Sequence, residues 1–136
     1  MEVEIFSLAD FAANTGNGKL TIVGTFDTLT THQMPVLQMC SLVLKLRISN
    51  AHVGKHKVLL KFLDPEGREF MPSPNIDIEV LENQFTDYNA IPIVLNLHPM
   101  KLDKIGKYAI ELYYDEEFHS GLKLMVIQSI PVQKAA

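Results

Sequence analysis

The 136-residue sequence is short of the residues that disulfides, reactive thiols and membrane spans require. It has one cysteine and no tryptophan. Cys40 has no second cysteine to pair with, and its apolar surroundings favour a small buried hydrophobe over a reactive thiol. No apolar stretch approaches the roughly 18 residues that span a bilayer, and the opening MEVEIF has acids where a signal peptide has basic residues. We therefore expect a cytoplasmic protein with no membrane partner.

Clusters of basic residues are also missing. The chain carries 12 Lys and Arg against 16 Asp and Glu, which gives a formal net charge of -4. The closest grouping, Lys101, Lys104 and Lys107, is loose, and we interpret it as a solvated loop. Nucleic acids bind to a concentrated basic surface that neutralises several phosphates. The sequence therefore predicts no nucleic-acid partner.

The usual signatures of catalytic, phosphate and metal sites are absent as well. His52 and His56 are four residues apart, but Gly54 lies between them and a strand is expected from His56, so their rings should diverge. The serines lack a G-x-S-x-G elbow. Gly16 and Gly18 lack the GxxxxGK[ST] pattern of a phosphate-binding loop. We predict a protein that is not an enzyme and that has no cofactor and no metal site.

The sequence has no convincing helical stripe, and period-two alternation takes its place. The clearest run puts Leu42, Leu44, Leu46 and Ile48 on one face of a strand, because successive strand residues point to opposite faces. Similar alternation occurs over residues 20–27, 57–62, 76–80, 91–97, 108–114 and 122–130. About eight or nine short strands without crossover helices predict one domain over residues 1–136. Its expected fold is all-β, an antiparallel Greek-key sandwich of the immunoglobulin-like kind, with a barrel as the alternative.

Turns and one short helical segment are expected between these strands. Asp64-Pro65-Glu66-Gly67 has the residues of a type I turn, and it should lead into a short strand over residues 68–71. The acidic group at residues 115–117 is typical of a hairpin tip. Residues 7–14 contain Ala12 and Ala13, two good helix formers, and we expect a helical turn there.

The acidic turns also suggest an alternative function. Calcium-binding sandwiches collect oxygen ligands from loops at one end, and the cation needs six to eight of them. Asp64 and Glu66 lie in one turn, Asp115 in another, and Asp87 in a third loop. The hypothesis requires these loops to meet at one end of the sandwich. A small-ligand or calcium-type site using the loops around Asp64 and Asp115 is therefore the second hypothesis.

The last expected strand, residues 122–130, has apolar residues on both faces. Leu124 lies on one face, whereas Met125 and Ile127 lie on the other. A strand that is apolar on both sides needs a cover for its second face. We predict that Met125 and Ile127 belong to a self-association or partner surface, with the chain's own N-terminal segment or the region of Pro72 as the alternative cover.

The tyrosines divide between core and surface. Tyr108 and Tyr114 share the buried face of one expected strand, where each hydroxyl should reach a backbone group. Tyr113 points to the opposite face together with Glu111, and we assign it to the same interaction surface. The first functional hypothesis is therefore an interaction module that binds another protein through a sheet face or a strand edge.

Four segments together resemble a family of small bacterial proteins of unknown function. They are LADFA at residues 8–12, GKLTIVGTFD at 18–27, LLKFLDPEGREF at 59–70 and IGKYAIELYYDE at 105–116. The resemblance implies an immunoglobulin-like or other Greek-key sandwich. It implies no catalytic residue and no ligand.

A glycine in one of these segments makes a structural prediction. Gly24 stands inside an expected strand, on the face that should be buried. A strand-interior glycine usually marks a bulge or a close approach of another chain segment. We predict that the LADFA segment, residues 8–12, packs against Gly24.

Overall fold

The computed structural model describes residues 1–129, and these form two β-sheets. The nine strands are β1 (Glu2–Asn14), β2 (Leu20–Phe26), β3 (Thr28–Thr31), β4 (Val36–Ser49), β5 (Gly54–Leu63), β6 (Asn75–Val80), β7 (Tyr88–Leu102), β8 (Gly106–Tyr114) and β9 (Glu117–Gln128). A 3₁₀ turn, η1 (Asn50–His52), joins β4 to β5. Ile130, the expected last residue of the final strand, lies outside the described residues.

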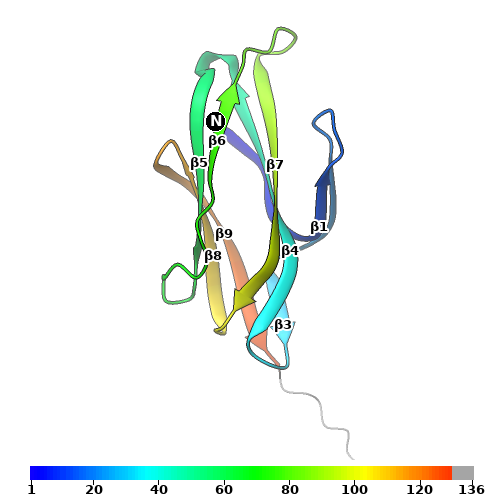
Figure 1. Ribbon diagram of the computed structural model, residues 1–136, viewed down its shortest axis with the longest axis vertical. Helices are drawn as coiled ribbons and strands as arrows, with labels where there is room; N and C mark the ends of the chain where they lie inside the picture. Colours follow the sequence, from blue (N-terminus) through cyan, green and yellow to red (C-terminus); the bar gives the residue numbers. More distant parts are fainter. Residues whose placement is uncertain (130–136) are drawn as a thin grey trace, which may run out of the picture.

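The two sheets pack as a sandwich, which confirms the predicted fold class. One sheet has the strand order β2-β1-β4-β7, and the other has the order β3-β9-β8-β5-β6. Figure 1 shows the two layers side by side along the long axis of the molecule. The pairings are antiparallel except that of β3 with β9, which is parallel. The second sheet is therefore mixed, a detail that alternation within single strands could not show.

The core lies between the sheets and follows the alternation seen in the sequence. Leu42, Leu44, Leu46 and Ile48 of β4 are fully buried, as predicted, and they face the buried residues of β5 and β8. Burying an aliphatic side chain of this size contributes about 1.5–3 kcal/mol. The central strands β4, β5 and β8 thus hold the two layers together.

The expected helical turn over residues 7–14 is wrong, because these residues belong to β1. They pair with β2 from Leu8 to Asn14 and with β4 up to Ala9. Strand pairing outweighs the modest helix propensity of Ala12 and Ala13, which is worth only a few tenths of a kcal/mol per residue, about 0.7 at most. Ala12 is nevertheless buried, since it packs in a second small cluster with Ala9 and Val43.

That second cluster forms because the β1–β2 hairpin bends. In Figure 1, β1 runs down from the N-terminus, turns, and rises to the hairpin tip, from which β2 descends again. The bend places Ala12, Leu20 and Ile22 against residues of the first half of β1 and the neighbouring strands. The hairpin therefore covers part of the outer face of the four-stranded sheet.

Gly24 lies between the paired residues Val23 and Thr25 of β2, opposite the LADFA segment, and it confirms the predicted close approach of that segment. Its φ of +69° is in the left-handed region, which side-chain-bearing residues rarely adopt. A Cβ at this position would collide with the carboxylate of Asp10, which belongs to LADFA. The backbone angle therefore requires glycine, whereas the exposed Asp10 carboxylate can move aside. The expectation that Gly24 lies on the buried face is wrong, because residues 23–25 are all exposed where the left-handed φ interrupts the alternation of β2.

The chain then crosses between the layers. β2 ends at Phe26 in one sheet, and β3 begins at Thr28 in the other. The carbonyl of Asp27, between them, accepts a hydrogen bond of 2.8 Å from the Met125 amide of β9. Two consecutive strands thus join the edges of both sheets on this side, which we call the closed side.

Tyr108 fixes the chain where β7 passes to β8. Its hydroxyl donates to the Lys104 carbonyl at 2.7 Å and accepts from the Lys104 amide at 2.9 Å. A buried tyrosine that bonds back to a backbone group a few residues upstream is the tyrosine corner of immunoglobulin-like sandwiches. The prediction for Tyr108 is confirmed.

Tyr114 does not follow the same prediction. Its hydroxyl is buried but has no hydrogen-bond partner among residues 1–129. Burial raises the pKa of Tyr114 to about 12, since the phenolate would be poorly solvated there. The ring itself stacks on His56 at a centroid distance of 5.2 Å, so packing accounts for its position.

The turn after β5 forms as predicted, but the strand expected beyond it does not. The Gly67 amide donates to the Asp64 carbonyl at 2.9 Å, and the Asp64 carboxylate accepts from the amides of Glu66 and Arg68. Over residues 68–71 only an isolated bridge between Leu63 and Glu69 is found. The segment stays beside β5, since the Phe70 amide donates to the Phe62 carbonyl at 3.1 Å. No continuous ladder forms, because Pro72 and Pro74 have no N–H to donate.

Candidate functional site

The side of the sandwich opposite β2 and β3 has two edge strands, β6 in one sheet and β7 in the other. We call this the open side, because the loop of residues 81–87 separates β6 from β7 in the chain. On the closed side, Asp27 alone separates β2 from β3. An edge strand presents unpaired main-chain groups on which a further strand can form. The open side is therefore where the fold itself offers a binding site.

The edges differ in how well they could accept another strand. β7 carries Pro92 and Pro99, which have no N–H to donate. β3 has only four residues, and β2 is bent at Gly24. β6 (Asn75–Val80) has six residues and no proline. It is the most regular edge of the described chain.

The hydrogen-bond pattern identifies which main-chain groups of β6 point outward. The Leu60 amide donates to the Pro74 carbonyl at 3.1 Å, so these two residues occupy a hydrogen-bonded position of the ladder, although Pro74 has no N–H to donate in return. In an antiparallel ladder such pairs alternate, which directs the main chain of Ile76 and Ile78 toward β5. The N–H and C=O groups of Asn75, Asp77 and Glu79 then point away from the sheet.

The other side of β5 confirms this assignment. Lys57, which lies opposite Asp77, donates its amide to Asp115 Oδ1 at 2.9 Å and accepts from the Asp115 amide at 2.9 Å. Its main chain is therefore turned toward β8 and away from β6. The main-chain groups of Asp77 are left without a partner on β5.

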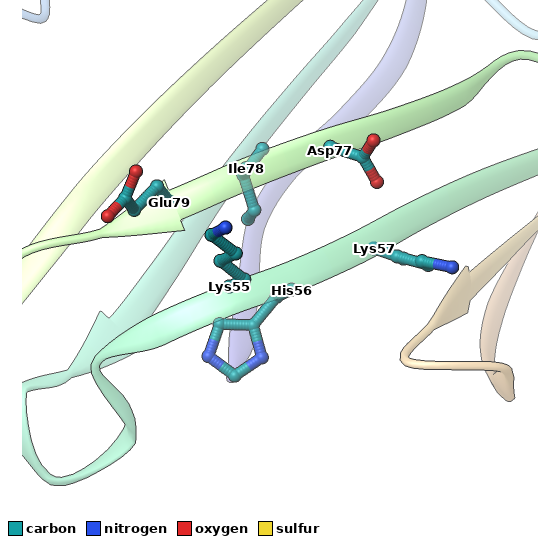
Figure 2. A pocket seen from close by; sticks show the side chains of 6 residues that line it. All are labelled: Lys55, His56, Lys57, Asp77, Ile78 and Glu79. Carbon is teal, nitrogen blue, oxygen red and sulfur yellow. The ribbon is translucent and has the colours of Figure 1, made fainter.

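A hollow of about 460 Å³ borders this edge. It is lined by Lys55, His56, Lys57, Asp77, Ile78 and Glu79. Figure 2 shows these residues on two neighbouring strands, with His56 projecting to the opposite side of β5 from Lys55. Strand alternation thus puts the four charged side chains on the outer face of the sheet. The register places Lys55 opposite Glu79, and Lys57 opposite Asp77.

His56 is held rigidly beside this hollow. Its Nδ1 lies 2.7 Å from Asp115 Oδ2, and its Nε2 lies 2.7 Å from the carbonyl of His52. Both partners are acceptors, so both ring nitrogens must donate, which favours the imidazolium. The hydrogen bond to Asp115 is the main cause of a raised pKa at His56.

The pKa of Asp115 is lowered in return. Burial works against the carboxylate, but hydrogen bonds from His56 and from the Lys57 amide outweigh it. A histidine whose two nitrogens are both occupied has no lone pair with which to accept a proton. The arrangement therefore anchors the β8–β9 hairpin to β5, and it does not resemble a general base.

The interaction residues expected from sequence share a face but do not form one cluster. Tyr113, Met125 and Ile127 all lie on the outer face of the five-stranded sheet. Tyr113 is paired with Phe118 at one end of β9, whereas Met125 and Ile127 lie toward its other end. Met125 is half-buried and Ile127 is 45% exposed. Ile127 therefore lacks a full cover among residues 1–129.

Tyr113 lies in a small aromatic and charged cluster of its own. Its hydroxyl donates to Glu111 Oε1 at 3.0 Å, its ring meets Phe118 edge-on at 5.7 Å, and Lys61 Nζ lies 4.7 Å from the ring centroid. These contacts satisfy the polar groups of Tyr113 within the chain. They make it a second, weaker candidate for a recognition surface.

The acidic loops of the calcium hypothesis lie apart. Asp64 follows the end of β5 that pairs with Ala109, whereas Asp115 follows the opposite end of β8. The two loops are therefore at different ends of the sandwich, and no single site uses both. Lys104 Nζ binds Asp64 Oδ2 at 2.9 Å, and this hydrogen bond is the main cause of a lowered pKa at Asp64. Within residues 1–129 no group of three or more His, Cys, Asp or Glu is placed to hold a metal.

The match to a family model covers residues 4–127. The chain belongs to a family of unknown function, DUF6941. The expected membership in a family of unknown function is confirmed. No curated protein matches this DUF6941 chain.

Two further features of the DUF6941 chain bear on its chemistry. Cys40 is fully buried, as predicted, and burial raises the pKa of its thiol to about 11. Such a thiol stays protonated and is a poor nucleophile. In the part of the chain that the structure describes, no helix has the length and apolar character needed to cross a bilayer.

The outward-facing edge of β6 was not predicted from the sequence. The alternation over residues 76–80 indicates a strand, but it carries no information on whether that strand is central or at an edge. One signal was available, because Asp77 and Glu79 put two charges on the exposed face of a short strand that follows two prolines. Charged, short strands are typical of sheet edges.

Proposed function

We propose that this DUF6941 chain is a non-enzymatic protein-binding module that adds an extended segment of another protein to β6. One observation carries the proposal: the main-chain groups of Asn75, Asp77 and Glu79 point outward from a regular, proline-free edge. In strand addition, these groups supply affinity and the neighbouring side-chain sites supply specificity. All three residues are exposed, so the edge is accessible.

The proposal also states that the chain has no catalytic activity. His56 uses both ring nitrogens for structural hydrogen bonds, and the buried Cys40 has a raised thiol pKa. Neither could act as a base or nucleophile without rearrangement. A free, buried cysteine also fits a reducing compartment, which supports the expected cytoplasmic location.

The outer-face cluster around Tyr113 is the alternative binding surface. It is supported by the T-shaped contact of Tyr113 with Phe118, whose ring is mostly exposed. Exposed aromatic groups are common anchors of protein interfaces. Its polar contacts are already made within the chain, which is why we favour the β6 edge.

Two matched variants separate the two surfaces. Asp77→Pro removes one outward N–H from β6 and leaves the outer-face cluster intact, whereas Tyr113→Ala does the reverse. We expect a partner captured from native lysate by the wild-type chain to be lost with Asp77→Pro and retained with Tyr113→Ala. Retention with Asp77→Pro and loss with Tyr113→Ala would move the site to the sheet face. Equal capture by wild type and both variants would contradict both assignments.

A further inference from the structure

On the outer face of the five-stranded sheet, opposite charges face each other across two strand pairs. β8 contributes Glu111 opposite Lys61 of β5, and β5 contributes Lys55 and Lys57 opposite the acids of β6. Opposite charges on neighbouring strands stabilise a pairing, and like charges oppose it. The next strand beyond β6 would continue the series with basic residues.

The β6 carboxylates are free to take part in such a pairing. The ion pairs within residues 1–129 are formed by other acids, namely Glu4, Asp64, Glu66, Asp103 and Asp115. Asp77 and Glu79 face the hollow at the edge and are exposed. Residues of an added strand directly opposite them would have Cβ atoms about 4.5–5.5 Å away.

The inner face of β6 has the opposite character. Ile76 and Ile78 pack against the core but remain half-buried, because β6 is the last strand of its sheet. An added strand would place every second side chain beside them, at the margin of the core. Apolar side chains there would remove further apolar surface from water.

The same charges disfavour pairing between two copies of this chain. If the isoleucines of two copies share the inner face of an antiparallel β6–β6 pair, the acids of both copies must share its outer face. It would therefore bring Asp77 or Glu79 of one copy beside the same acids of the other. A second copy is the poorer occupant of this edge.

From these features we infer that β6 binds an extended segment in which Lys or Arg alternates with Val, Ile or Leu. This inference rests on the proposed function and specifies the chemistry of the partner. The basic side chains lie beside Asp77 and Glu79, and the apolar side chains lie beside Ile76 and Ile78. Main-chain hydrogen bonds to Asn75, Asp77 and Glu79 fix the register.

Three capped peptides of equal length test the inference by NMR titration of the full chain. One alternates Lys with Val, one Glu with Val, and one Thr with Val, so that only the charge differs. We expect the Lys–Val peptide to bind at least about tenfold more tightly than the Glu–Val peptide. We also expect it to slow amide exchange at Asp77 and Glu79, which marks strand addition and not a loose ionic contact.

Variants of the edge provide the control. The Asp77→Asn, Glu79→Gln double variant should abolish the preference for Lys–Val over Glu–Val, and Asp77→Lys with Glu79→Lys should reverse it. The neutral double variant keeps the shapes of both side chains, so it tests charge even where the lysine variant folds poorly. The unfolding transition of each variant in urea shows whether its fold is retained.

The outcomes distinguish the inference from the function on which it rests. Equal binding of all three peptides with protected β6 amides would overturn the inferred chemistry and leave strand addition standing. Failure of every peptide to protect Asp77 and Glu79 would overturn strand addition itself. Protection that appears without peptide and grows with protein concentration would identify a second copy as the occupant and overturn the inference.

Discussion

The closed and open sides of this sandwich solve the problem of sheet edges in different ways. On the closed side, β2 passes directly into β3, so one stretch of chain borders both layers and Asp27 is tied to β9. On the open side, the edge strands β6 and β7 are separated by the longer loop of residues 81–87. The closed side depends on a glycine with a left-handed φ, whereas the open side depends on charge for its protection. A change at Gly24 should therefore cost stability, whereas a change of the outward groups of β6 should alter binding.

The largest effect is expected from Gly24→Val on the closed side. A valine would have to adopt φ near +69° and would meet the Asp10 carboxylate. We expect a loss of about 2–4 kcal/mol in the free energy of unfolding, measured by urea denaturation. Gly121→Val is the matched control, because nothing lies within 4 Å of a Cβ there. Equal stability of Gly24→Val and wild type would show that the bend does not need glycine.

A smaller effect is expected from proline on the open side. Ile78→Pro removes a ladder donor and an apolar contact, and it should cost about 2 kcal/mol. Asp77→Pro removes an outward donor and should cost less than about 1 kcal/mol. Urea denaturation of the two variants compares adjacent residues of one strand. The reverse order of stabilities would mean that the assignment of inward and outward amides is wrong.

Tyr108→Phe tests the crossing from β7 to β8, at the lower end of the open side. It removes both hydrogen bonds to Lys104 and leaves its amide and carbonyl without that partner. We expect a loss of about 1–2 kcal/mol by thermal or urea unfolding. Tyr113→Phe, which removes a surface hydrogen bond to Glu111, should cost clearly less. Similar losses in both variants would argue against a special role for the tyrosine corner.

The smallest effect concerns the anchor between His56 and Asp115. The pKa of His56 is raised, so its contribution is complete below the unfolded value of 6.5 and is lost as pH rises through the folded value. The pKa of Asp115 is lowered from 3.8, so its contribution is present above that value and is lost as pH falls through the folded value. The pair therefore stabilises the fold most between pH 3.8 and pH 6.5, the ordinary pKa values of the two groups.

His56→Gln exposes this pH dependence. Because the Asp115 side chain is 46% exposed and solvent screens the pair, we expect the variant to lose under about 1 kcal/mol near pH 5. The loss should shrink near pH 8.5, well above the ordinary histidine pKa of about 6.5. His119→Gln is the control, since the His119 ring contacts Ser120 and not a carboxylate. A difference that grows with pH would contradict the charged form of His56.

The parts of this fold that could be predicted are those in which local sequence and burial agree. Leu42 to Ile48 alternate because one face meets the core, and Gly24 stands out because a strand interior rarely omits a side chain. The helical turn expected at Ala12 and Ala13 is wrong because pairing with β2 and β4, which lie elsewhere in the sequence, decides their conformation.

The candidate site could not be predicted for the same reason. Whether β6 is central or at an edge depends on strand order, which arises from pairings between distant segments. The sequence indicated the charges of Asp77 and Glu79, but it did not indicate that β6 is the edge strand of its sheet. Tyr113 was placed on the correct face, yet Met125 and Ile127 lie at the other end of it.

Native-state amide hydrogen exchange of the chain alone tests the open edge most directly. The account predicts fast exchange at Asp77 and Glu79 and slow exchange at Ile76 and Ile78, at every protein concentration. Slow exchange at Asp77 and Glu79 in dilute protein would show that the edge is covered, and would contradict the account.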